Sequence, residues 1–349
     1  MCKVLKLTKV VVSPRLWAVL VVICTFISFK FSWRMTWDAK DKSQAYSFPA
    51  EFKCPLSVPS PSPSSGWPSP LSKNVYFVET SEEIKPSFLF MCSVESAARF
   101  HPESKIIVLM KGLAKYNITL AKHLNFPLFS CFTNIEIKPL DMKDLFLDTP
   151  LADWYLLAQQ RKGPYFLPIL SDACRIAIMW KFGGIYLDTD FIVLKSLRNL
   201  TNVIAIQSKH LLNGAFLSFT PRHKFIELCM KDFVENYNRW IWGHQGPQLF
   251  TRVFKKWCSN HSLQSSKGCR GITLLPRETF YPIRWQEWRK YFEVIKASEL
   301  TELLKNTYAA HVWNKISKGT QLDITSKALL AQLKFHYCPS TYGLMKTYH

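Results

Sequence analysis

The chain has 349 residues, of which 48% are hydrophobic, and it carries a formal net charge of +20. This length and apolar content are sufficient for one large α/β domain with a substantial core and appended segments. Nucleic acid is excluded as a partner, because the basic residues are spread along the chain without a basic helix, zinc spacing or RNA-binding signature.

The N-terminal segment has the features of an uncleaved membrane anchor. Basic residues occur throughout residues 1–15, and an uncharged apolar run follows at 16–29. With lysine and arginine snorkelling at its end, the run extends over 16–34, about the length that crosses a bilayer. No small-x-small cleavage site follows. We therefore expect a cytoplasmic tail, a single transmembrane anchor in type II orientation, and a lumenal C-terminal domain.

The segment after the anchor is predicted to be a stem. Residues 35–73 contain a dense run of proline and serine at 55–70. Proline at this density forms neither a helix nor a central strand. The catalytic domain is accordingly expected over 74–349.

Strand and helix patterns alternate along the folded part, which predicts an α/β domain with a mostly parallel sheet flanked by helices. The remainder of the chain is rich in aromatic residues and less regular. Expected strands are 74–80, 105–110, 135–140, 185–187 and 213–219, and expected helices are 87–100, 141–147, 171–182 and 224–237.

The most informative motif is GGIYLDTD at 183–190. Its apolar run indicates a buried strand that ends at Asp188 and Asp190. Ligands of open α/β sheets bind beyond the carboxyl ends of strands, and paired carboxylates bind hard divalent cations. The motif therefore predicts a site for a cation that also holds the diphosphate of a nucleotide sugar.

The helix expected just before this strand carries a charged pair. Ser171 is suited to cap its start and Gly183 to end it. Asp172 and Arg175 are three residues apart, so they share one helical face near the carboxylates. A sugar hydroxyl and a phosphate are suitable partners for these two charges.

Several segments together resemble D-x-D glycosyltransferases of the fold called GT-A, in the group of α-1,4-galactosyl- and α-1,4-N-acetylglucosaminyltransferases. The resemblance covers nearly everything from about residue 74 onwards and extends to the membrane-anchored layout. The segments that carry it are 88–99, 148–155, 171–190, 240–248 and 311–314.

The resemblance implies a metal site and a donor site. Asp190 would be the first ligand of Mn²⁺, Asp188 would contact the ribose or sugar and the metal, and His311 would complete the site. Asp172 and Arg175 match a pair that binds the donor sugar. The ion would act as a Lewis acid on the leaving UDP of UDP-galactose.

Further substrate contacts are expected from the resemblance and from the analogy of fold. Tyr76 and Glu79, at the end of the first strand, are expected near the uracil and ribose by analogy of fold. Gln245 is a candidate catalytic group on the face of the sugar opposite the leaving group. Asn213 and Gly214 are expected to approach the sugar closely, because glycine permits tight backbone contact.

The implied reaction is transfer of galactose, with retention, to the 4-hydroxyl of a terminal galactose on a glycolipid. Lactosylceramide would be the acceptor and globotriaosylceramide the product, in the Golgi membrane. Alternatives are an N-acetylglucosaminyltransferase acting on glycoprotein glycans, a membrane-tethered lectin without turnover, and an aspartyl phosphatase, whose pattern residues 191–193 fit poorly. The sequence leaves open whether the chain also forms a homo-oligomer.

Glycosylation and cysteine patterns agree with a lumenal domain. Acceptor sequons begin at Asn117, Asn199 and Asn260. Eight cysteines lie beyond the anchor, so some should pair in an oxidising compartment. Cys258 and Cys269 are the simplest local pair, and Cys174 is expected to be free.

Overall fold

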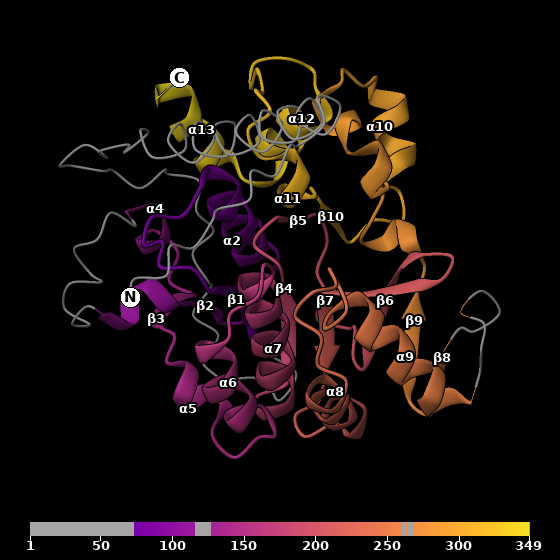
Figure 1. The fold of residues 1–349 in the computed structure, drawn as a ribbon. Coiled ribbons are helices and arrows are strands. Elements are labelled where there is room, and N and C mark those ends of the chain that lie inside the picture. Colours follow the sequence, from indigo (N-terminus) through magenta and orange to yellow (C-terminus); the bar gives the residue numbers. More distant parts are fainter. Residues whose placement is uncertain (1–72, 116–126, 260–262, 264–267, 349) are drawn as a thin grey trace, which may run out of the picture. The chain divides into compact units, whose positions relative to one another are not determined.

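The computed structural model describes residues 73–115, 127–259, 263 and 268–348 (Figure 1). The predicted cytoplasmic tail and membrane anchor, and the predicted stem up to residue 72, lie outside this part of the chain. Within the described ranges, no helix combines the length and the hydrophobicity that crossing a bilayer requires.

An eight-stranded sheet in the order β3-β2-β1-β4-β7-β6-β9-β8 forms the centre of the fold (Figure 1). The first four strands in this order are parallel, whereas β7 runs antiparallel to both β4 and β6. The expected α/β class is confirmed, and the parallel arrangement is interrupted at β7. The strands are β1 Val75–Glu79, β2 Ile106–Met110, β3 Ile135–Pro139, β4 Gly184–Leu187, β6 Val203–Ser208, β7 Leu211–Phe219, β8 Gly268–Cys269 and β9 Ile272–Leu275, and a separate two-stranded sheet pairs β5 Phe191–Val193 with β10 Ala309–His311.

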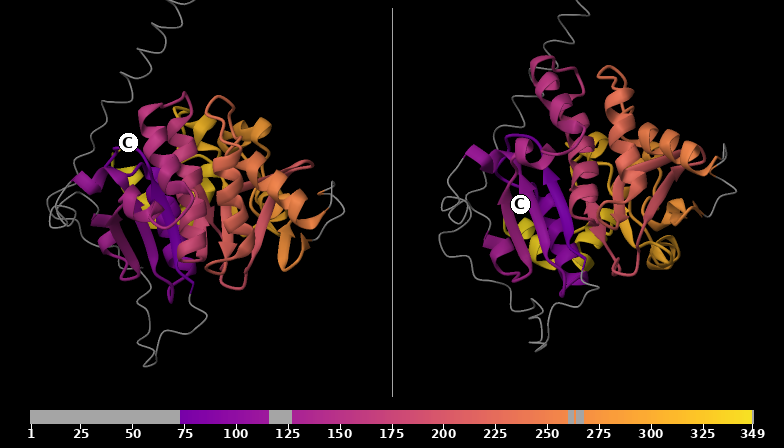
Figure 2. Two further views of the ribbon diagram at one scale, coloured as in Figure 1. Left: turned by 60° about the horizontal axis from the view of Figure 1, so that its bottom comes forward. Right: turned by 90° about the horizontal axis from the view of Figure 1, so that it is seen from below.

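Helices cover both faces of the large sheet (Figure 2). The helices α7, α8 and α9 pack on one face, while α2, α12 and α13 lie on the other. Alternate residues of a strand point to opposite faces, so Tyr76 and Val78 of β1 join the core beneath α7. The helices are α2 Phe88–Phe100, α4 Pro127–Ser130, α5 Met142–Phe146, α6 Leu151–Gln160, α7 Phe166–Lys181, α8 Lys224–Glu235, α9 Pro247–Cys258, α10 Ala297–Leu304, α11 Asn314–Ser317, α12 Leu329–Tyr337 and α13 Pro339–Tyr348, with 3₁₀ turns η1 Lys111–Lys115, η2 Arg277–Thr279 and η3 Trp285–Phe292.

The helix before the D-x-D motif starts earlier than the sequence predicted. It begins at Phe166, so Ser171 lies inside it and does not cap it. Pro168 is tolerated in the first turn, because the N–H that proline lacks has no intrahelical acceptor there. The predicted end is confirmed, since Gly183 adopts φ +62° and its N–H donates to Met179 O at 3.1 Å. A Cβ at Gly183 would lie 2.5 Å from Pro221 N, so this tight exit requires glycine.

Disulfides link α2 to the chain before α13 and the end of α9 to β8. Cys258 and Cys269 are bonded, as predicted, and Cys92 of α2 is bonded to Cys338 beside α13. Cys174 is buried and free, as expected. The α2–α13 connection is reinforced by Glu95, whose buried carboxylate accepts hydrogen bonds from the backbone N–H groups that begin α13.

Candidate active site

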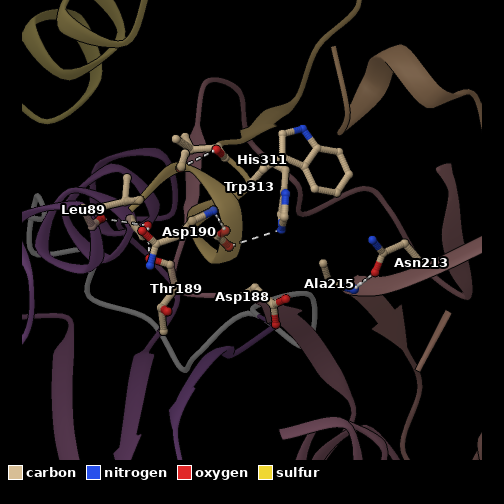
Figure 3. Close-up of polar contacts among 12 residues, drawn as sticks. Leu89, Asp188, Thr189, Asp190, Asn213, Ala215, His311 and Trp313 are labelled. Carbon is tan, nitrogen blue, oxygen red and sulfur yellow. Dashed lines mark hydrogen bonds and ion pairs between the residues drawn. The ribbon is translucent and has the colours of Figure 1, made fainter. Parts of the chain in front are cut away.

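The two carboxylates of the D-x-D motif lie between the large and the small sheet (Figure 3). Strand β4 ends at Leu187, and the chain enters β5 at Phe191. The Asp188 N–H donates to Ala215 O of β7 at 2.9 Å, and Thr189 O accepts a hydrogen bond from the Ser93 hydroxyl of α2 at 2.8 Å. Contacts with the neighbouring strand β7 and with helix α2 therefore fix the conformation of this segment.

His311 reaches the carboxylates through strand pairing. The short strand β10 runs antiparallel to β5, with His311 opposite Phe191. Its Nε2 atom lies 3.2 Å from Asp190 Oδ1 (Figure 3). Ligand atoms of Asp188, Asp190 and His311 all lie within 4.8 Å of one another. The structure thus brings together the three residues predicted as metal ligands.

The environment of Asp190 favours its ionised form. Asp190 Oδ2 accepts the backbone N–H of Asn314 at 2.8 Å, and Asp190 O accepts the N–H of Val312 at 2.9 Å. Burial raises the pKa of Asp190, but the charge and hydrogen bond of His311, together with the Asn314 N–H, outweigh it and leave the pKa below its usual value. Asn314 was not singled out from the sequence, because a backbone donor leaves no side-chain signature.

Aromatic side chains fix the imidazole ring of His311. Phe191, Tyr281 and Trp313 pack on it, with ring centroids 4.7, 5.6 and 4.4 Å away. Its Nδ1 atom is buried and has no hydrogen-bond partner among the described residues. Trp313 adopts φ +59°, and its indole N–H donates to Ile283 O at 2.9 Å. The packing leaves Nε2, which faces Asp190, as the ring atom suited to bind a cation.

Asp188 is held by different groups from those that hold Asp190. Its Oδ1 atom lies 3.1 Å from Arg175 Nη2 and accepts the Tyr186 hydroxyl at 2.7 Å. The Arg175 guanidinium also lies over the Tyr186 ring, 5.0 Å from its centroid. Burial raises the pKa of Asp188, Arg175 opposes this effect, and the carboxylate of Asp190 adds to it, so the pKa stays above its usual value.

Asp172 lies on the other side of Arg175. Its Oδ1 atom is 3.4 Å from Arg175 Nε, as the three-residue spacing on α7 predicts. Burial raises the pKa of Asp172 to about 6, although Arg175 lowers it. A Cβ at Gly246 would lie 2.7 Å from both oxygens of the buried Asp172 carboxylate, so only glycine lets the chain pack this closely against it. Gly246 was not predicted as a site residue, since only its place beside Asp172 reveals its role.

Gln245 does not offer a free group to a sugar. It is fully buried, its Nε2 donates to Phe233 O at 2.7 Å, and its Oε1 accepts the N–H of Asn238 at 3.1 Å. The His244 ring nitrogen lies 2.6 Å from the same Oε1. These contacts argue against the expected catalytic role and assign the amide to holding the segment between α8 and α9.

Asn213 and Gly214 lie on β7 beside the motif. Asn213 Oδ1 accepts the N–H of Ala215, the residue whose carbonyl binds Asp188 (Figure 3). Its Nδ2 donates to Gln207 Oε1 at 2.7 Å, so both ends of the amide are engaged. A Cβ at Gly214 would lie 2.2 Å from the Phe250 ring. Packing against α9 therefore accounts for this glycine without a sugar contact.

The two residues of β1 differ in position. Glu79 ends the strand at the same edge as the D-x-D motif, and its carboxylate accepts the Ser81 N–H at 2.8 Å. Tyr76 points to the opposite end, where its ring stacks on Phe182 at 6.0 Å and its hydroxyl contacts Asn74. These contacts argue against the expected uracil contact of Tyr76.

Of the three sequons, only that of Asn199 falls in the described part. Asn199 is exposed in the connection between β5 and β6. Asn117 and Asn260 lie outside the described residues.

The donor set suits a divalent cation with oxygen and imidazole ligands. Two carboxylates and one imidazole converge where the β4 strand leaves the sheet. The buried Arg175 holds Asp188, whereas His311 contacts Asp190. Such a cluster, at the ligand-binding edge of an α/β sheet, is suited to hold a metal ion together with a diphosphate.

Comparison with known proteins supports this assignment. Residues 87–211 match the glycosyltransferase sugar-binding region containing the DXD motif, and residues 218–345 match the conserved region of α-1,4-glycosyltransferases. The fold and the D-x-D site define a glycosyltransferase, an enzyme that transfers a hexose. Within that class, the chain belongs to the α-1,4-glycosyltransferase family.

Individual relatives differ in similarity. Human lactosylceramide 4-α-galactosyltransferase is 61% identical over 93% of this chain and 91% of that protein. Human α-1,4-N-acetylglucosaminyltransferase is 38% identical over 85% of this chain and 88% of that protein. The solved structure of galactosyltransferase LgtC with donor and acceptor sugar analogues is 14% identical, with a TM-score of 0.42 over 78% of this chain and 95% of that chain.

Proposed function

We propose that the protein transfers galactose from UDP-galactose to the 4-hydroxyl of the terminal galactose of lactosylceramide, with retention at the anomeric carbon, and so makes globotriaosylceramide. The observation that carries this proposal is the 61% identity to human lactosylceramide 4-α-galactosyltransferase, against 38% to the N-acetylglucosaminyl enzyme. The intact cluster of Asp188, Asp190 and His311 supports an active enzyme over a lectin without turnover, because buried charges are costly to retain without use.

Mn²⁺ is the proposed ion at this cluster. Asp190 and His311 would bind it directly, and Asp188 would complete the protein ligands, since Mn²⁺ accepts carboxylate and imidazole donors together. When bound, the ion supplies Lewis-acid stabilisation of the negative charge on the departing UDP.

The residues around the metal site have separate proposed tasks. Arg175 orients Asp188 through its guanidinium and keeps a positive charge beside the diphosphate. Asp172, which lies beside Arg175 on α7, would accept a hydrogen bond from a hydroxyl of the donor sugar. Phe191 and Trp313 shield the His311 ring from water, which strengthens the electrostatic interactions inside the site.

The proposed location is the Golgi membrane, in type II orientation with the catalytic domain in the lumen. The basic, apolar N-terminal sequence supports an anchor. The Cys92–Cys338 and Cys258–Cys269 disulfides and the exposed Asn199 sequon agree with an oxidising, glycosylating compartment. Protease protection of intact Golgi vesicles should spare the catalytic domain, and removal of N-glycans should increase the gel mobility of the wild type but not of Asn199→Gln if Asn199 is the occupied site.

The activity is tested with the full chain purified in detergent. Lactosylceramide is incubated with Mn²⁺ and either UDP-galactose or UDP-N-acetylglucosamine, with and without EDTA. We expect an α-1,4-linked trihexosylceramide from UDP-galactose alone, lost with EDTA and in Asp190→Ala, and retained in Asp144→Ala, which changes an exposed aspartate of α5. Transfer only from UDP-N-acetylglucosamine would replace the donor assignment, and binding of sugar without turnover would favour the lectin.

A further inference from the structure

Exposed apolar side chains gather on one part of the described domain. Twelve large hydrophobic residues are exposed in the described chain, and half of them lie on α6, in the first turn of α7 or in the segment between α8 and α9. Exposed apolar side chains gathered in this way are typical of a contact with another molecule or a membrane. We call this set the apolar rim, and it consists of Leu156, Leu157, Leu167, Trp240, Ile241 and Trp242.

Contacts join the segments that carry the apolar rim. Figure 2 shows α6 beside the end of α8, and Trp154 of α6 packs edge-on against Phe233 of α8 at 4.8 Å. Arg239 Nη1 donates to Arg161 O at 2.9 Å, and Tyr165 packs against Trp242 at 5.5 Å. A cleft of about 510 Å³ lies between them, with Leu157 and Trp240 in its wall.

Cations accompany the aromatic rings of this surface. The Arg239 guanidinium lies 4.9 Å from the Trp240 ring centroid, and Lys315 Nζ lies 5.7 Å from that of Trp242. Lys162 Nζ lies over Phe166 at 5.3 Å. Tryptophan flanked by lysine and arginine is typical of surfaces at the membrane–water interface, where the ring enters the headgroup layer and the cations contact lipid phosphates.

Two chain segments connect the apolar rim to the active site. Lys315, which lies over Trp242, follows Asn314, whose N–H binds Asp190 Oδ2 at 2.8 Å. Helix α7, which begins directly after Tyr165, carries Asp172 and so extends from the rim to the donor site. A membrane held against the rim would therefore lie next to the mouth of the site.

We propose that the apolar rim docks the catalytic domain on a lipid bilayer. Trp240, Ile241 and Leu157 enter the interfacial layer, while Arg239 and Lys162 pair with lipid phosphates. This contact holds the site beside the surface from which a lipid-borne sugar projects. Only the benefit to a lipid acceptor rests on the proposed function, because the docking itself requires no turnover.

Photolabelling tests the contact. The full chain is reconstituted into phosphatidylcholine vesicles that contain a lipid with a diazirine on its acyl chain, illuminated, and digested for mass spectrometry. We expect labelled peptides from 151–162 and 236–246, and none from 285–292, where Trp285 is 47% exposed outside the rim. Equal labelling of the Trp285 peptide, or no labelling of the rim, would overturn the proposal.

Kinetics provide the second readout. Leu157→Ser and Trp240→Ser change side chains that are 65% and 64% exposed, so the fold should tolerate both, and Trp285→Ser is the matched control. In the double variant we expect the KM for lactosylceramide in vesicles to rise about tenfold, the equivalent of about 1.4 kcal/mol of binding, with unchanged kinetics on water-soluble methyl β-lactoside.

The outcomes separate the two proposals. An equal loss on both acceptors would overturn the membrane role, because it would place the defect in the site itself. A wild type that uses neither acceptor would refute the proposed function, while rim labelling would still decide the docking.

Discussion

Arg175 Nη2 lies 3.1 Å from Asp188 Oδ1, so a helix buried on one face of the sheet holds the first carboxylate of the D-x-D motif. The second carboxylate, Asp190, is held from the opposite side by His311 and the Asn314 N–H. The pKa of Asp188 is raised and that of Asp190 is lowered. The two aspartates are therefore not equivalent, and substitutions around each should have different effects.

Replacing Arg175 with lysine should impair activity although the charge is kept. Lysine cannot keep the contacts with Asp188, Asp172 and the Ser171 carbonyl together, because it lacks the planar fork of the guanidinium. We expect kcat/KM to fall about 10- to 100-fold, as for other groups that orient metal ligands. Steady-state kinetics of Arg175→Lys against Arg284→Lys, an exposed control, would measure it, and equal activities would contradict the assignment.

Replacing His311 with glutamine should weaken cation binding. The variant removes the imidazole Nε2 next to Asp190 but keeps a polar side chain of similar length. Mn²⁺ affinity, measured by electron paramagnetic resonance without substrates, should fall by at least about tenfold. His336→Gln on the exposed face of α12 is the control. Unchanged affinity in His311→Gln would remove this residue from the metal site.

Asp172→Asn should change the dependence of stability on pH. Burial raises the folded-state pKa of Asp172 from 3.8 to about 6, so the folded protein binds this proton more tightly than the unfolded chain does. The Asp172 contribution to the free energy of unfolding is then most favourable below about pH 4 and falls as the pH rises to about 6, by on the order of 3 kcal/mol.

Asparagine removes this ionisation, so the metal-free variant should be more stable than the metal-free wild type at pH 7.5. The difference in the free energy of unfolding between the two should be smaller at pH 4. Thermal unfolding across this range, with Asp144→Asn as the control, measures the difference. Transferase activity should fall at the same time, the combination expected where a functional charge is retained at a cost in stability. A pH profile of stability identical to that of the wild type would contradict the buried ionisation.

Gln245→Glu should lower the stability of the fold rather than remove a catalytic group. The change places a carboxylate oxygen against Phe233 O, where the amide now donates at 2.7 Å. Leaving a buried carbonyl without its donor costs about 1–3 kcal/mol, more with a charge present. We expect a lower Tm in thermal unfolding. A loss of kcat with an unchanged Tm would instead restore the catalytic role that the sequence suggested.

Removing the Cys92–Cys338 disulfide should destabilise the domain more than removing Cys258–Cys269. The first bond closes 246 residues and the second closes 11. Loop-closure entropy predicts roughly 5 kcal/mol against roughly 3 kcal/mol. Paired serine variants, compared by chemical denaturation, would check the order. A larger effect from the short loop would show that native packing, rather than chain entropy, governs these bonds.

Much of the site was readable from local sequence. The strand before Asp188, the helix carrying Asp172 and Arg175, and the glycine exit at Gly183 follow from apolar runs, three-residue spacing and backbone freedom. These features depend on residues close together in the chain. The start of α7 at Phe166 was missed because apolar residues and a first-turn proline gave no sharp capping signal.

By itself, the sequence determined the strand that delivers the D-x-D carboxylates, the α/β class and the spacing of the charged pair, since each depends on local periodicity and residue chemistry. Only the tertiary structure decided that His311 meets Asp190, that Tyr76 points away from the site, and that the amide of Gln245 forms hydrogen bonds with backbone groups. The pairing of β10 with β5, the direction of a strand side chain and the partners of a buried amide are set by packing between distant segments, which no local pattern records.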